Sequence, residues 1–143
     1  EIEYEAQAAI ELEMLAPDEI GERGDCYPFS VVEQQGVRVV RLGELLSAVV
    51  QDIRNQAPSD IISIRFHRTV AQIVAQMCRL VAQETGINRV ALSGGVFQNR
   101  LLLRLATGAL EEEGLSVLSH RLVPANDGGI SLGQAVIANF AGG

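Results

Sequence analysis

The sequence predicts a helix-rich α/β fold in which short parallel strands are flanked by helices. Its second half alternates between helical patterns and short apolar runs, in the order helix, strand, turn, helix, strand, turn, helix. Strands that are joined by a crossover helix lie parallel, and the crossover is right-handed. A turn that contains a Gly-Gly pair and opens a helix follows each strand. In sheets of this kind ligands bind at the carboxyl ends of the strands, which is where both turns fall.

The first 58 residues are predicted to form a helix, a hairpin and a second helix. Apolar residues recur near one helical stripe over residues 4–15, with Glu and Gln opposite. Two β-branched runs, 29–33 and 37–42, flank Gln34-Gln35-Gly36 and predict a β-hairpin. Residues 45–55 place their apolar side chains on one face, which predicts another helix.

Residues 59–143 begin with the longest predicted helix, which runs to about residue 85. Ser59-Asp60 can cap its start, and Gly86 suits a left-handed cap at its end. The sequence then predicts, in order, a strand over 90–92, a helix over 97–113, a strand over 115–119, and a helix that starts at Asp127 or Gly128 and ends near 140.

Composition is that of one globular domain in a reducing compartment. The 143 residues are 48% hydrophobic, with a net charge of −7, and all 11 basic residues are scattered arginines, which argues against a nucleic-acid partner. Cys26 and Cys78 have no metal-binding spacing, so we expect a cytoplasmic protein. No run approaches the ~18 apolar residues of a membrane span, and no signal peptide is visible. The chain begins without Met inside a predicted helix, so we expect it to be part of a longer protein.

The two glycine-containing turns are the strongest functional signal. Ser93-Gly94-Gly95 follows the first strand of the alternating half, and Gly128-Gly129 opens the last helix. Glycine has no Cβ, so a ligand can approach the backbone closely. Free amides at the positive end of a helix dipole suit a phosphate. Two such turns therefore suggest two walls of one nucleotide cleft.

Two polar side chains in these turns are candidates for ligand contacts. Asp127 is the only carboxylate in either turn, and it could cap the helix, bind a divalent metal, or do both. The Asn99 amide both donates and accepts, which suits a ribose or an adenine edge. The alternative for Asn99 is a polar residue that faces solvent.

Other catalytic patterns are missing from the sequence. Ser93 does not lie in a Gly-x-Ser-x-Gly elbow, and no histidine is placed by the sequence to activate it. We interpret His67 and His120 as structural or surface residues, because neither has a metal-ligand spacing. A Walker loop and a Gly-x-Gly-x-x-Gly motif are also absent, so P-loop and dinucleotide-binding functions are weak alternatives.

Several segments, taken in order, resemble a known family. They are Tyr4–Glu13, Tyr27–Phe29, Arg65–His67, Ser93–Asn99 and Asn126–Ala135. Nearly the whole chain resembles the C-terminal part of the HypF carbamoyltransferases of [NiFe]-hydrogenase maturation. The resemblance implies part of an actin/Hsp70-like (RNase H-like) ATPase lobe, of the Kae1-like type, with helices packed on a small sheet. Residues 1–143 would be a single C-terminal fragment of that domain, with a helical and hairpin segment over 1–58 and an α-β-α-β-α nucleotide-binding half over 59–143.

The resemblance also implies a reaction. Such proteins use ATP with Mg²⁺ and carbamoyl phosphate to form carbamoyl-adenylate, and transfer the carbamoyl group to the C-terminal cysteine of HypE for the cyanide ligands of the [NiFe] centre. Asp127 would be a ligand of an active-site divalent metal, Fe or Zn, with Asn126 as its rival. The expected nucleotide-binding residues are Ser93, Gly94, Gly95, Asn99, Gly128 and Gly129.

The chain also departs from the family pattern, and alternatives stay open. It has no His-x-x-x-His pair for the metal, and one Asp does not bind a metal tightly, so we expect the fragment alone to be inactive. The alternatives are a tRNA threonylcarbamoyl transferase of the same superfamily, a lobe of a sugar or acetate kinase, and a non-catalytic module that docks a partner or forms a homodimer.

Overall fold

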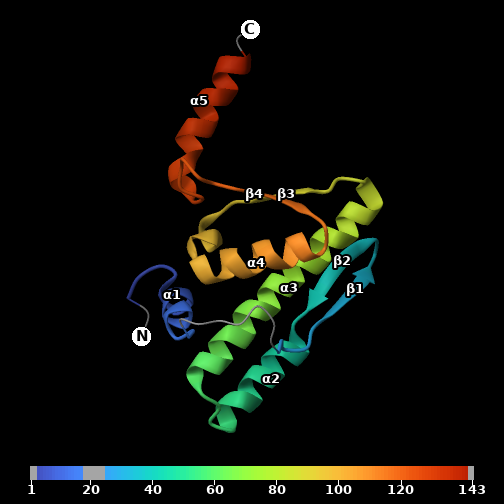
Figure 1. The fold of residues 1–143 in the computed structure, drawn as a ribbon, viewed down its shortest axis with the longest axis vertical. Helices are drawn as coiled ribbons and strands as arrows, with labels where there is room; N and C mark the ends of the chain where they lie inside the picture. The colour runs from blue at the N-terminus through green and yellow to red at the C-terminus, as the bar shows by residue number, and fades with distance from the viewer. Residues whose placement is uncertain (1–2, 18–24, 142–143) are drawn as a thin grey trace.

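The computed structural model describes residues 3–17 and 25–141 (Figure 1). Over these residues two helices, η1 (Gly95–Gln98) and η2 (Asp127–Gly129), are 3-10 helices, and the others are α-helices. The elements are α1 (Gln7–Met14), β1 (Ser30–Gln34), β2 (Val37–Arg41), α2 (Gly43–Arg54), α3 (Ser59–Thr85), β3 (Arg89–Leu92), η1 (Gly95–Gln98), α4 (Arg100–Glu112), β4 (Ser116–Ser119), η2 (Asp127–Gly129) and α5 (Ile130–Ala141). None of the described helices is both long and apolar enough to cross a membrane.

The long helix α3 organises the described part of the chain. The β1–β2 hairpin and α2 lie along one side of it, and α4 packs across it beside the β3–β4 pair (Figure 1). Strands β3 and β4 are parallel and are joined through α4, as the sequence predicts, with Leu92 opposite Ser119 at their carboxyl ends. Helix α5 leaves this edge and extends away from the rest (Figure 1).

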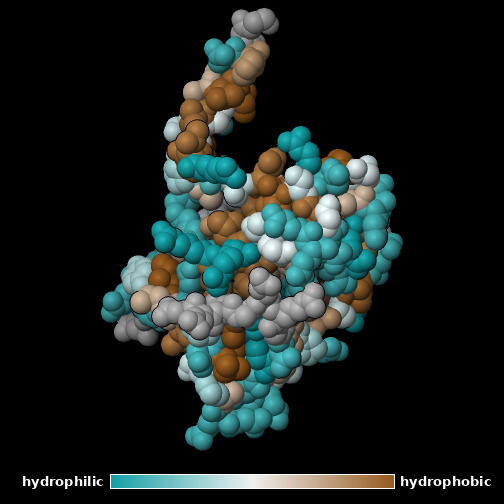
Figure 2. Space-filling model, in the orientation of Figure 1, coloured by the Kyte–Doolittle hydropathy of each residue, from teal (hydrophilic) through white to brown (hydrophobic). Residues whose placement is uncertain are grey.

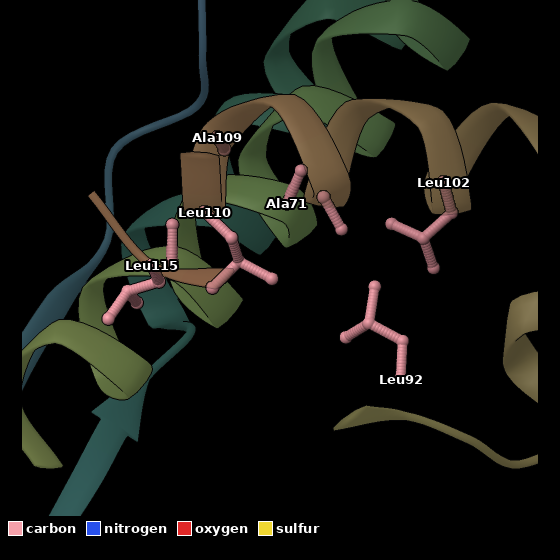
Figure 3. Close-up of a cluster of buried hydrophobic side chains, with 8 residues drawn as sticks. Ala71, Leu92, Leu102, Ala109, Leu110 and Leu115 are labelled. Atoms are coloured by element: carbon pink, nitrogen blue, oxygen red, sulfur yellow. The ribbon is translucent and has the colours of Figure 1, made fainter. Parts of the chain in front are cut away.

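The core lies between α3, α4 and the parallel pair. Its side chains point toward one another in Figure 3. Four of them are alanines, and such small side chains let the two helices approach closely while leucines fill the space beside the strands. The buried cluster consists of Ala71, Ala75, Leu92, Leu102, Ala106, Ala109, Leu110 and Leu115.

Most of the predicted helices and strands are confirmed, and the differences lie at their ends. The hairpin and the full length of α3 are as predicted, and Gly86 has the expected left-handed conformation, with φ of 72°. The α-helix predicted from residue 97 begins only at Arg100, because Gly95–Gln98 forms a 3-10 turn first. The cap predicted at Ser59-Asp60 is wrong, since Pro58 is the N-cap and no side chain accepts a cap hydrogen bond.

A buried tyrosine ties the segment before the hairpin to α2 and α3. Tyr27 is only 1% exposed, its hydroxyl donates to Asp52 Oδ2 at 2.8 Å, and its amide donates to Thr69 Oγ1 at 2.8 Å. Arg65 donates to the same Asp52 oxygen at 2.6 Å, and its guanidinium carbon lies 4.5 Å from the centre of the Tyr27 ring. Burial first, and then the hydrogen bond to Asp52, raises the pKa of Tyr27 to about 12.

This shift predicts a specific loss of stability at high pH. A folded-state pKa above the ordinary 10.0 stabilises the fold below pH 10 and loses that contribution as pH rises toward 12. We expect the free energy of unfolding to fall by roughly 2 kcal/mol over that window through this group. Urea unfolding at several pH values checks this. In Tyr27→Phe this decrease in the free energy of unfolding should be absent. In Tyr4→Phe, at a tyrosine that is 51% exposed, the decrease should remain. Equal pH profiles for the two variants would contradict the assignment.

Candidate functional site

The structure brings the two glycine turns side by side at one edge of the parallel pair. The amide of Gly94 donates to the carbonyl oxygen of Ala125 at 2.8 Å. A Cβ built on Gly95 would lie 4.0 Å from Asn126 Cβ. Because β3 and β4 are parallel, their carboxyl ends meet at this edge. The two turns therefore lie close enough to line one cleft.

Gly94 occupies a backbone conformation that only glycine adopts readily. Its φ is 104° and its ψ is 159°, a region that is essentially closed to residues with a Cβ. Within the described residues nothing else lies within 4 Å of where a Cβ would be, so the requirement is conformational and not steric. This glycine lets the chain turn sharply out of β3 and expose backbone at the strand end.

The second turn needs its glycines for close packing against its own loop. A Cβ on Gly128 would lie 3.1 Å from Asn126 Oδ1 and 3.1 Å from Pro124 Cγ, and one on Gly129 would lie 3.0 Å from the Pro124 carbonyl oxygen. The Asn126 side chain accepts from the Gly128 amide at 3.1 Å, and its carbonyl oxygen accepts from the Gly129 amide at 3.0 Å. These amides hold the turn together.

Asn126, and not Asp127, caps the last helical segment. The Asn126 side chain is the N-cap acceptor of η2, which leaves the Asp127 carboxylate exposed at the start of that segment. The capping alternative for Asp127 is therefore wrong. Among the described residues no cluster of three or more His, Cys, Asp or Glu could hold a metal ion. Asp127 alone does not form a metal site, and its role as a ligand stays a prediction that needs further ligands.

Asn99 links the first glycine turn to α3 and α4. It is the N-cap of α4, where its Oδ1 accepts from the Leu102 amide at 2.7 Å. Its Nδ2 lies 3.0 Å from Nε2 of His67, whose Nδ1 lies 2.8 Å from the Ser63 carbonyl oxygen. That carbonyl requires Nδ1 to carry the proton, so Nε2 accepts from Asn99. The solvent-facing alternative for Asn99 is wrong, whereas a nucleotide contact stays a prediction and would have to compete with these bonds.

His67 has the structural role that the sequence suggested. It is 4% exposed and lies on α3, where it accepts from the side chain that caps α4. It ties the first glycine turn to the core.

The Glu13 carboxylate caps the N-terminus of α4, where the sequence predicts free amides for a phosphate. Its Oε1 accepts from the amides of Arg100 at 2.8 Å and Leu101 at 3.2 Å. A carboxylate is stabilised there by the helix dipole. The expectation of free amides at this helix start is therefore wrong. No local pattern marks this contact, because the two partners lie 87 residues apart in the chain.

His120 lies beside Ser93 at the carboxyl ends of the two parallel strands. His120 is exposed, which confirms its interpretation as a surface residue, but its Nε2 lies 2.9 Å from Ser93 Oγ, a contact that the sequence alone did not indicate. Ser93 directly follows β3 and His120 directly follows β4. The pairing of Leu92 with Ser119 puts them at the next register position, so the strand register was the signal that could have revealed the contact.

An open pocket of about 840 Å³ lies elsewhere, between the hairpin and α2. Arg41, Glu44 and Gln51 are among its lining residues. Figure 1 shows the hairpin and α2 across α3 from the glycine turns. Despite its size, we do not assign this pocket as the functional site, because the candidate ligand-binding residues lie at the carboxyl ends of β3 and β4.

Comparison with known proteins establishes the family. Residues 1–134 match the family described as carbamoyltransferase, Kae1-like domain, second subdomain. The chain belongs to this family. Carbamoyltransferase HypF of Synechocystis sp. is 34% identical over 134 residues, which are 94% of this chain and 16% of that protein. A carbamoyltransferase HypF homolog of Cupriavidus necator is 36% identical over 138 residues, covering 94% of this chain and 34% of that protein.

A solved structure confirms the predicted fold class. The crystal structure of full-length HypF in its phosphate- and nucleotide-bound form superposes with a TM-score of 0.87 and 41% identity. The match covers 99% of this chain and 18% of that one. The α/β, helix-rich lobe expected of the Kae1-like class is therefore present. The chain spans about a sixth to a third of the length of these relatives.

The two bonds of Asn99 predict how its variants unfold. Asn99→Ala removes the cap of α4 and leaves His67 without its donor, so we expect a loss of about 2–3 kcal/mol in the free energy of unfolding. Asn99→Ser keeps a capping oxygen but does not reach His67, so its loss should be about 1 kcal/mol. Denaturant titrations of both variants measure the difference. Equal losses would show that Asn99 does not act as the cap.

Proposed function

We propose that this chain supplies one wall of the nucleotide site of a HypF-type carbamoyltransferase that works in hydrogenase maturation. The whole protein would use ATP and carbamoyl phosphate to form carbamoyl-adenylate and would transfer the carbamoyl group to the C-terminal cysteine of HypE. The observation that carries the proposal is the bond between Gly94 and Ala125, which sets two glycine turns side by side at the ends of parallel strands. Membership of the family supports it.

The backbone at this edge suits a nucleotide. Gly94 bends the chain so that main-chain atoms face outward at the end of β3, with no Cβ between them and a ligand. The relative with a TM-score of 0.87 was solved in a phosphate- and nucleotide-bound form, which supports the same class of ligand here. Ser93, Gly95, Gly128 and Gly129 share this edge. We propose that Ser93 contacts the nucleotide through its hydroxyl and Gly95 through its amide. Gly128 and Gly129, whose amides donate within the turn, would let the nucleotide approach without a Cβ in the way.

The proposed metal would need ligands from beyond this chain. Asp127 offers one exposed carboxylate, and a single carboxylate does not hold Fe, Zn or Mg²⁺ tightly. The full-length protein would therefore supply the other ligands. This gives a physical reason to expect that the 143-residue chain does not catalyse the reaction alone. We also propose a cytoplasmic location, in which Cys26 and Cys78 would stay reduced.

The proposal is tested with the full-length gene product. Carbamoyl-adenylate formation should appear as pyrophosphate release from ATP that depends on carbamoyl phosphate. Asp127→Ala should lower that rate by about a hundredfold or more, as loss of a metal-held or charge-stabilising group does. Glu112→Ala removes an exposed carboxylate from the far end of α4 and should leave the rate unchanged. Release that is independent of carbamoyl phosphate, or an unaffected Asp127→Ala variant, would contradict the proposal.

The surface of α5 supports a docking role for this helix as well. Residues 130–140 are all exposed, and Figure 2 shows their apolar side chains along the projecting helix. They include Ile130, Leu132, Val136, Ile137 and Phe140. An apolar helix of this kind buries its surface against protein. We propose that in the parent protein it packs on a part of the chain that lies outside these 143 residues.

Gel filtration tests this proposal for α5. The 143-residue chain should associate as its concentration rises, because the apolar side chains of α5 stay uncovered. Substitution of Ile137 and Phe140 by Ser should suppress that association, whereas Leu122→Ser, at a side chain that is 98% exposed outside α5, should not. A strict monomer at every concentration would argue against the need for a partner surface.

A further inference from the structure

The backbone amides expected to hold a phosphate at the strand ends are largely used within the chain. In the described part of the structure, the following amides already donate to oxygens of the protein: Gly94, Arg100, Leu101, Leu102, Gly128 and Gly129. An anion would have to displace the Glu13 carboxylate, the Asn99 cap or the Asn126 cap to reach them. The amides of Gly95 and Val96 at the start of η1 have no acceptor among the described residues, so a phosphoryl group would meet these two amides and the side chains beside them.

One pair of side chains at this edge still has a donor to offer. Ser93 and His120 are exposed, and across the described residues each has its single side-chain hydrogen bond to the other, at 2.9 Å. They stand at the carboxyl ends of the two parallel strands, one step beyond the last backbone pair. Gly94, which bends the chain at this point, directly follows Ser93.

Counting protons shows that the pair always keeps a donor free. A neutral imidazole carries one N–H and a serine carries one O–H, and the bond between them uses one of the two. When Nε2 donates to the serine, the Ser93 hydroxyl points its proton elsewhere. When the serine donates to Nε2, the proton on Nδ1 is the free one. In either tautomer one donor remains for a ligand, and a protonated imidazole would leave two.

The pair is not needed to hold the fold. Backbone hydrogen bonds already join β3 to β4, and α4 covers them with the buried cluster. Substitutions at exposed positions away from caps and cores usually change stability little. If the pair is only structural, variants at Ser93 and His120 should change the free energy of unfolding little and leave ligand affinity unchanged. If the pair contacts a ligand, the same variants should lower ligand affinity strongly.

We propose that Ser93 and His120 act together as a contact for phosphoryl oxygens at the edge between the two glycine turns. The inference rests on the nucleotide function proposed above and adds His120 as a binding residue. The phosphoryl group could belong to the phosphate chain of ATP or to carbamoyl phosphate, and the chemistry of the contact is the same for both. A charge-assisted hydrogen bond to phosphate is short and strong, which suits a donor held ready by a neighbour.

The test is a set of calorimetric titrations of the full-length gene product with ATP–Mg²⁺, adenosine and carbamoyl phosphate. His120→Leu removes the imidazole donor at an exposed position and should weaken binding of one of the phosphoryl ligands about tenfold, while adenosine binding stays unchanged. His120→Gln places an N–H near the position of Nε2 and should recover most of that loss. Arg104→Gln removes a positive charge from an exposed position on α4 and serves as the control for general electrostatics.

A double-mutant cycle shows whether the two residues act as one unit. If they do, Ser93→Ala combined with His120→Leu should weaken binding no more than His120→Leu alone. The arm that weakens identifies the source of the phosphoryl group. The inference would be overturned if His120→Leu bound ATP–Mg²⁺ and carbamoyl phosphate as tightly as the unsubstituted protein, or if it lost affinity for adenosine to the same extent. Either result would leave the proposed nucleotide function intact. No binding of ATP or carbamoyl phosphate by the unsubstituted protein would overturn both.

Discussion

The packing of α4 across α3 is the constraint on which the rest of the described structure depends. The two helices meet with little side chain between them, because four alanines at their contact are almost fully buried: Ala71 and Ala75 of α3, and Ala106 and Ala109 of α4. Helix α4 is also the crossover between β3 and β4, and its position fixes the parallel pair. A change that separated the helices would separate the strands and, with them, the two glycine turns.

Polar side chains then fix the start of α4 relative to its surroundings. Asn99 joins that start to His67 on α3, and Glu13 on α1 covers the next two amides. The Ser63 hydroxyl also donates to the Leu12 carbonyl oxygen, which holds α1 against α3. These contacts satisfy amides that would otherwise be open at a helix end. At the strand ends, free hydrogen-bonding capacity remains in the Gly95 and Val96 amides and in the exposed side chains of Ser93, His120 and Asp127.

The sequence predicted the elements of this fold well, and the site less completely. Periodicity and turn chemistry located the hairpin and all of α3, because those signals are local. The 3-10 segment before α4 was missed, since Gly94 and Asn99 interrupt a pattern that otherwise reads as one helix. Glu13 could not be assigned to α4 from the sequence, because tertiary contacts between distant residues have no local signature. His120 could have been placed beside Ser93 by extending the predicted parallel pairing by one residue.

The central claim is that the two glycine turns form one wall that a nucleotide contacts. Hydrogen–deuterium exchange of the full-length gene product, with and without ATP–Mg²⁺, tests it most directly, because exchange reports each segment separately. Bound nucleotide should slow exchange in residues 93–99 and in residues 120–130 together. Protection of only one turn, or of the hairpin and α2 instead of either turn, would contradict it.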